Sequence, residues 1–316
     1  MEKKIFIFVF SVALIFNLSA KEHDFSFGVD FGSLTGQVQE IVYRNSKTDN
    51  KLSELLWNFS PDYIGLDIRY SWLKPGNVLG IFTNGSFKFG ISDGADIMED
   101  KDWLSDNYPN WLTHYSVHDN KVDTLNMMDF NLGMSIVIFQ KLLLKPYFSY
   151  HYMHFEWSAR GGSILYPTVS KDEDTGKYYA DHYYLKPIKI ITYEQTWHAV
   201  APGISIYGEF NRFFDIEIAF EATPFIWCTA IDNHILRDLV ITDKLTGGLL
   251  FETNILFSYK PTDHFVLSFS VVIRETEKTR GNSKYEEAGK PAFTEKNIGG
   301  VGYNAVGVGL ITKFKF

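Results

Sequence analysis

The strongest constraint on this chain is a period of two in its hydrophobicity. Large apolar residues alternate with small or polar ones in segment after segment, as in Phe25-Ser26-Phe27-Gly28. This is the period of a β-strand whose two faces meet different surroundings. The alternation recurs at 25–31, 64–72, 128–138, 214–221, 249–259, 265–273 and 306–316. The pattern predicts an all-β fold.

The connections between these segments alternate in length. Short ones lie at 74–77, 141–145, 209–212 and 260–263, and long ones near 44–51, 91–122, 166–187, 231–246 and 277–298. Short turns on one side and long loops on the other are typical of an outer-membrane barrel, and closure removes the free sheet edges. We therefore predict a transmembrane antiparallel β-barrel of about ten strands, with short periplasmic turns and long extracellular loops. A soluble β-sandwich is the alternative, because its strands also alternate.

The first residues predict export. A basic start, an apolar stretch and small residues up to Ala20 form the pattern of a secretory signal peptide. We expect residues 1–20 to be this peptide and 21–316 to be one barrel domain; an uncleaved membrane anchor is the alternative. The formal charge of −8 argues against nucleic-acid binding. Cys228 is the only cysteine, so no intrachain disulfide can form.

The small-residue face of the strands carries many acids. By parity they point into the barrel: Asp30, Asp67, Asp129, Asp215, Glu217, Glu221 and Glu252, and also Glu40. Arg69 and Arg274 offset them in part. For most of them we expect an internal salt-bridge network that fills a narrow lumen.

Two short motifs have the spacing of catalytic groups. Asp100 and Asp102 stand at i and i+2, as do Asp232 and His234, and in extended backbone such residues share a face. Paired carboxylates raise the pKa of one member, and an aspartate beside a histidine stabilises the imidazolium. Facing one another across a barrel mouth, the two motifs would hold a water able to attack an amide carbon. A divalent metal site and a solvated acidic loop are the alternatives.

Several segments, in their order along the chain, resemble the omptin family of outer-membrane endopeptidases. They are Phe31-Gly32-Ser33-Leu34-Thr35-Gly36, Glu40, Leu55 to Phe59, Glu99 to Trp103, Trp111, His118, Ser158 to Ser163, Trp227, Asp232 to His234, and Thr279 to Ser283. The resemblance covers nearly all of 21–316 and implies a barrel that cleaves protein or peptide substrates at the cell surface.

The resemblance also implies roles for the two motifs. Water would be activated between Asp100 and His234, with Asp232 orienting the imidazole and Asp102 placing the water or the substrate amide. Neither a metal nor another cofactor is implied, and no acyl-enzyme. Glu40 matches one of the acids that hold a basic residue of the substrate.

The sequence departs from the family pattern at two places. Ala230 stands where the family has its other substrate-binding acid, so a preference for basic residues rests on Glu40. His154 and Thr196 stand where arginines on the outer face would bind lipopolysaccharide. The sequence therefore does not predict strong dependence on lipopolysaccharide, although contact with outer-membrane lipid is expected.

Other candidate residues are interpreted as structural. We expect His118 to support the fold, Arg160-Gly161-Gly162 to form a bend at the rim, and Cys228 to be a small strand residue. The main alternative to a surface endopeptidase is a barrel of the same fold that acts as an adhesin or binding protein. A passive pore is the third interpretation, and the many large and charged lumen groups oppose it.

Overall fold

The computed structural model describes residues 23–165 and 182–316, so the predicted signal peptide lies outside the described residues. The order of elements is β1 His23–Tyr43, β2 Lys51–Phe59, β3 Asp62–Trp72, β4 Leu79–Gly90, β5 Asp96–Asp102, β6 His114–Phe139, β7 Leu142–Leu165, β8 His182–Glu209, β9 Phe214–Thr223, β10 Ile226–His234, the 3-10 turn η1 Ile235–Arg237, β11 Leu239–Thr246, β12 Leu250–Tyr259, β13 Phe265–Glu287 and β14 Phe293–Lys315. Within the described ranges, no helix is both long and apolar enough to span a membrane.

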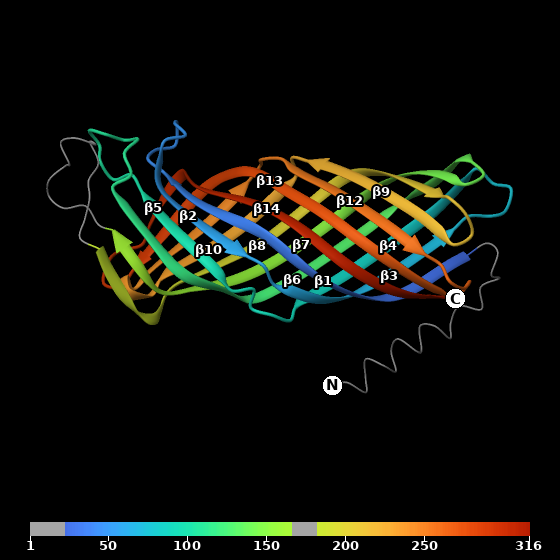
Figure 1. The fold of residues 1–316 in the computed structure, drawn as a ribbon. Helices are drawn as coiled ribbons and strands as arrows, with labels where there is room; N and C mark the ends of the chain where they lie inside the picture. The colour runs from blue at the N-terminus through green and yellow to red at the C-terminus, as the bar shows by residue number, and fades with distance from the viewer. Residues whose placement is uncertain (1–22, 166–181) are drawn as a thin grey trace.

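The strands close into one antiparallel barrel, because β14 pairs with both β1 and β13 (Figure 1). We call the end that holds Phe316 and the short turns the terminal end, and the other end the distal end. The ring is β1-β3-β4-β6-β7-β8-β9-β12-β13-β14 near the terminal end and β1-β2-β5-β6-β7-β8-β10-β11-β13-β14 near the distal end. Both rings have ten strands, which confirms the predicted fold class.

Four of the ten barrel strands are interrupted between the two rings. Pro61 separates β2 from β3 and Pro224 lies between β9 and β10, where the missing N–H ends the ladder. Gly94, between β4 and β5, has φ +48°, and an added Cβ there would lie 2.2 Å from the nitrogen of Pro61. Gly248, between β11 and β12, also has a positive φ, +83°. Because of these breaks, β2, β5, β10 and β11 form the distal ring where β3, β4, β9 and β12 form the terminal one.

The short turns predicted at 74–77, 209–212 and 260–263 are confirmed, whereas the one predicted at 141–145 lies at 140–141, because β7 already begins at Leu142. The strands also reach further at the distal end than the sequence indicated. The segment 91–122 contains β5 and the start of β6, 231–246 contains β10 and β11, and 277–298 is mostly β13 and β14. Polar side chains occupy both faces of these extensions, which hides the alternation that identifies a strand. The motif with Asp100 and Asp102 therefore lies in a paired strand and not in a loop.

The outer surface carries a belt of exposed apolar side chains. It includes Phe31, Phe130, Leu132, Phe148, Ile204, Phe220, Ile255, Phe269, Ile273 and Val308. A membrane-spanning barrel needs such a belt. On β10 its last member is Trp227, so the rest of that strand projects beyond the apolar belt toward the distal end.

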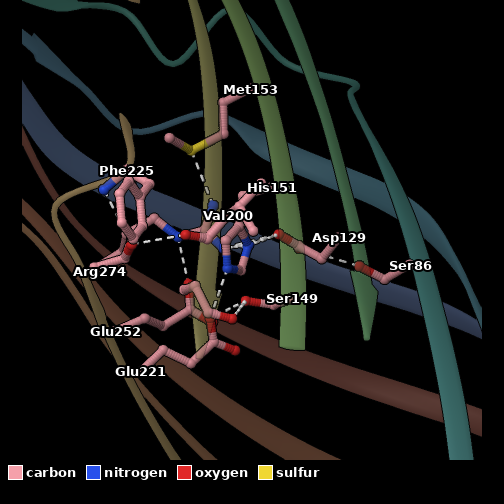
Figure 2. A network of polar contacts seen from close by, with 12 residues as sticks. Ser86, Asp129, Ser149, His151, Met153, Val200, Glu221, Phe225, Glu252 and Arg274 are labelled. Atoms are coloured by element: carbon pink, nitrogen blue, oxygen red, sulfur yellow. Dashed lines mark hydrogen bonds and ion pairs between the residues drawn. The ribbon is translucent and has the colours of Figure 1, made fainter. Parts of the chain in front are cut away.

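Ion pairs link most of the inward acids inside the belt, as predicted, but they do not fill the lumen, because a cavity lined by Arg69, Lys145 and Glu217 remains near the terminal end. Figure 2 shows His151 between Asp129 and Glu221, with ring nitrogens 2.6 and 2.7 Å from their carboxylate oxygens. Arg274 contacts Glu252 and lies 2.8 Å from Asp129. Further pairs are Lys88 with Asp30, Lys145 with Glu217, and Lys313 and Arg69 with Asp67.

An aromatic layer lies between this network and the distal end. Trp57 stacks on Tyr193 with ring centroids 5.4 Å apart, and Phe155 stacks on Trp157 at 5.1 Å. Phe59 contacts Phe155, and all five side chains are buried. We use the name aromatic layer for these five residues. The interior between the lumen network and the distal end is therefore packed with apolar side chains.

Candidate active site

His234 and Asp232 form a dyad on the inner face of β10. The Nε2 atom of His234 lies 2.6 Å from an Asp232 carboxylate oxygen, and the Asp232 side chain is almost fully buried. A carboxylate can only accept, so Nε2–H donates and the lone pair of the neutral ring is on Nδ1. The dyad therefore presents a base whose tautomer is set by its partner.

Asp100 and Asp102 lie on β5, which pairs with β2 on one side and β6 on the other. They share the face of Met98, a fully buried side chain, because residues two apart in a strand point the same way. Asp102 stands between Ser53 and His114 in the ladder. One oxygen of Asp100 is buried without a hydrogen-bond partner in the described structure.

The two motifs meet across the distal end of the barrel. Strands β6, β7 and β8 separate β5 from β10 along the wall, so their inner faces look toward one another. The charges of Asp100 and His234 act on each other's protonation. The structure thus brings together the two motifs that spacing singled out, although Asp102 and Asp232 lie 130 residues apart in the chain.

Burial and mutual charge shift the protonation of these groups. Burial, then the charge of Asp102, raises the pKa of Asp100 to about 7. Burial likewise raises the pKa of Asp102, and the hydrogen bond from the Ser53 hydroxyl lowers it in part. Burial opposes the imidazolium of His234, but the Asp232 carboxylate outweighs it and the net pKa is raised. The Asp100 carboxyl can therefore exchange a proton near neutral pH.

Glu40 lies on the inner face of β1, near the dyad, and is 2% exposed. Burial raises its pKa strongly, and the next largest causes are the negative charges of Asp232, Asp243 and Asp100. Ala230 is also buried on this face. The predicted substrate-binding acid therefore lies beside the dyad.

Sequence reasoning missed three residues at or beside the site. Arg237, in η1, lowers the pKa values of Asp100, Asp102 and His234. Asp243 lies opposite Ala230 in the ladder. Ser116 lies opposite Asp100, and its hydroxyl is 2.7 Å from Nε2 of His118. The inward parity of Ile241, Asp243 and Leu245 was the one signal available for Asp243.

The remaining sequence candidates have structural positions. His118 is buried, and its Nδ1 lies 2.5 Å from the carbonyl oxygen of Gly161. Gly161 and Gly162 have φ values of +52° and +99° and interrupt the ladder, which confirms the predicted bend. Cys228 is buried on the inner face of β10, as predicted.

The metal alternative depends on donor geometry. In residues 23–165 and 182–316, no group of three or more His, Cys, Asp or Glu side chains is arranged to hold a metal ion. The described donors of the site are thus grouped as one dyad and one acidic pair, on opposite walls.

Comparison with known proteins shows which proteins this chain resembles in sequence and in fold. It is 26% identical over 303 residues to the plasminogen activator of Yersinia pestis, covering 94% of this chain and 88% of that relative. It is 24% identical to the outer membrane protease IcsP of Shigella flexneri, covering 99% and 98%. The crystal structure of the outer membrane protease OmpT from Escherichia coli has the same fold, with a TM-score of 0.81 and 19% identity over 93% of this chain and 97% of that one. The Omptin family model matches residues 21–316, so the chain belongs to the omptin family.

Proposed function

We propose that this protein is an outer-membrane endopeptidase that hydrolyses peptide bonds with an activated water. The observation that carries the proposal is the Asp232–His234 dyad facing the half-buried carboxyl of Asp100, one oxygen of which is buried and unpartnered in the described structure. Family membership and relatives named as outer membrane proteases support it.

The catalytic step follows from the position of the lone pair. A water held between Asp100 and Nδ1 of His234 gives its proton to the imidazole while its oxygen adds to the amide carbon. Asp232 stabilises the imidazolium, and Asp102 helps to place the water or the amide. The C–N bond then breaks, and His234 returns the proton to the leaving amine. No bond forms between enzyme and substrate.

We propose that the distal end faces the cell exterior. The short turns and Phe316 lie at the terminal end, which in a barrel of this type is the periplasmic side. Proteins and peptides outside the cell would then reach the site directly. Glu40 gives the groove a buried acid beside the dyad, which favours substrates with a basic residue next to the cleaved bond.

A peptide screen tests the proposal. Refolded protein in detergent is incubated with fluorogenic peptides that carry Arg-Arg, Arg-Lys, Arg-Val or neutral pairs. Cleavage that resists EDTA and serine-directed inhibitors is expected. An adhesin or a pore would cleave none of the peptides, and loss of activity in EDTA would instead favour a metal site.

Arg237 is expected to set the pH at which activity appears. Its charge lowers the pKa values of Asp100, Asp102 and His234, so Arg237→Gln raises all three. His234 must be neutral to accept a proton, and the rising limb of kcat/KM against pH therefore moves to higher pH. The alkaline plateau stays in place. Because Arg237 is exposed, the shift shrinks at high salt.

The control for this profile is Lys290→Gln, which removes an exposed charge paired with Glu287 at another tip of the distal end. Its profile should match that of the unchanged protein. An Arg237→Gln limb that moves to lower pH, or does not move, would contradict the assigned protonation states.

We expect activity without lipopolysaccharide. His154 lies on the outer face 3.4 Å from Glu156 and 3.8 Å from Glu194, with Thr196 at 3.0 Å. Two carboxylates repel the phosphates of a lipid headgroup. Peptide hydrolysis in lipopolysaccharide-free micelles should therefore stay the same when lipopolysaccharide is added; strong activation would show that this surface binds the lipid.

A further inference from the structure

The buried acids of the barrel fall into two groups. Inside the apolar belt each of the charged networks contains a base, as in Asp129 with Arg274 and Asp30 with Lys88. Near the dyad the balance differs, because the charges that act most strongly on Glu40 are all negative, and one of them is Asp243. A carboxylate removed from water without a cation is costly. The surroundings of Glu40 and Asp243 are therefore short of positive charge, whereas Arg237 acts on Asp100 and His234.

Asp243 has the geometry of a binding group and not of a lumen ion pair. It lies on β11 opposite Ala230 of β10 and Ser283 of β13, and it is 3% exposed. Its Oδ1 atom has no hydrogen-bond partner among the described residues, and the same holds for Oε2 of Glu40. Burial raises the pKa of Asp243 to about 6. The Ser283 hydroxyl beside Asp243 partly lowers this pKa, and one oxygen of each of the two carboxylates stays without a partner among the described residues.

A glycine on the wall between the two acids leaves the space for this arrangement. The wall runs β11-β13-β14-β1, and Gly299 of β14 lies two residues from Val301, the ladder partner of Glu40. An added Cβ on Gly299 would lie 2.8 Å from the carboxylate of Asp243 and 2.5 Å from the Ser283 hydroxyl. Both acids therefore lie on the same part of the inner wall, between β11 and β1.

We propose that Asp243 and Glu40 together form the subsite for a cationic side chain of the substrate, with Asp243 supplying from β11 the carboxylate that Ala230 lacks on β10. The inference rests on the proposed peptidase function and names the residue that sets its specificity. A guanidinium has five N–H donors in a planar fork and can bond two carboxylates at once. Its charge also removes the repulsion between the two buried acids. A neutral side chain of the same shape would leave them unpaired.

The test compares two peptides that differ by one group. One has arginine beside the cleaved bond and the other has citrulline, which is nearly the same shape but uncharged. The unchanged protein should cleave the arginine peptide with the higher kcat/KM. Asp243→Asn should lower that value about 10- to 100-fold, because a charge-assisted hydrogen bond is lost. The citrulline peptide should be cleaved at nearly the original rate, which also shows that the variant is folded.

The control is Glu286→Gln, the same acid-to-amide change on an exposed position of β13. It should keep the preference for arginine. If Asp243→Asn also keeps the preference, Asp243 is not part of the subsite. If the unchanged protein cleaves both peptides equally, the subsite as a whole is disproved while the peptidase function stands. If it cleaves no peptide in the screen, the proposed function itself fails.

A second variant covers the case in which Asp243→Asn loses all activity. Ala230→Asp with Asp243→Asn moves the carboxylate to the ladder partner across β10 and β11. Recovery of the arginine preference would support a binding role for the charge. Equal cleavage of both peptides by the double variant, or no cleavage of either, would assign Asp243 a structural role and overturn the inference.

Discussion

His234→Ala is expected to lower kcat by about 10²- to 10⁴-fold, the range for loss of a general base. Asp100→Ala removes the other side of the water site and should have an effect of similar size. KM should change little, because neither residue is assigned to hold the substrate. The double variant should be only slightly slower than either single one, since groups that act as one unit are not additive. Single-turnover hydrolysis of the best peptide in the screen measures all three.

Matched controls are available on the same molecule. Asp96→Ala changes an exposed aspartate on the same strand as Asp100, and His264→Ala changes an exposed histidine at the terminal end. Both should keep the activity of the unchanged protein. A His234→Ala variant that retains most of its kcat would exclude the imidazole as the base, and the water would need another proton acceptor.

Arg274→Met is expected to destabilise the barrel by about 3–5 kcal/mol, the cost of breaking a buried ion pair by removing one partner. Arg274 is 3% exposed, and among the described residues its removal leaves His151 as the ion-pair partner of Asp129 and takes away the ion pair of Glu252. The methionine has a similar length, so cavity formation adds little. Unfolding in denaturant, followed by the change in gel mobility of the folded barrel, measures the loss.

Removing the orphaned charge should restore part of this loss. In Arg274→Met with Glu252→Gln, one uncompensated carboxylate is gone, so the double variant should be more stable than Arg274→Met alone. Arg212→Met, in the exposed turn after β8, is the control for loss of an arginine as such. Equal stability of Arg274→Met and Arg212→Met would show that the lumen network does not stabilise the fold.

The barrel and the inward acids could be predicted because both depend only on parity. Asp30 and Glu221 must face inward once their apolar neighbours face lipid, and a closed lumen leaves bases as their partners. The two motifs could be recognised because a strand puts i and i+2 on one face. Their meeting could not be derived from spacing, since it depends on how many strands separate β5 from β10 along the wall.

The distal half was harder to predict for a physical reason. Beyond the apolar belt both faces of the wall meet polar surroundings, so a strand such as β5 loses the contrast that marks it in the sequence. Arg237 and Asp243 are then ordinary charged residues in a polar stretch. Only the ladder between β10 and β11, which puts Asp243 opposite Ala230, brings Asp243 close to the dyad and Glu40.

The aromatic layer has a consequence for traffic through the molecule. Because Trp57, Trp157 and their neighbours pack the interior directly beneath the groove, a cut chain has no exit through the cylinder. Both fragments must leave by the mouth through which the intact chain entered. With the proposed function, digestion would then be confined to the side of the membrane on which the distal end lies.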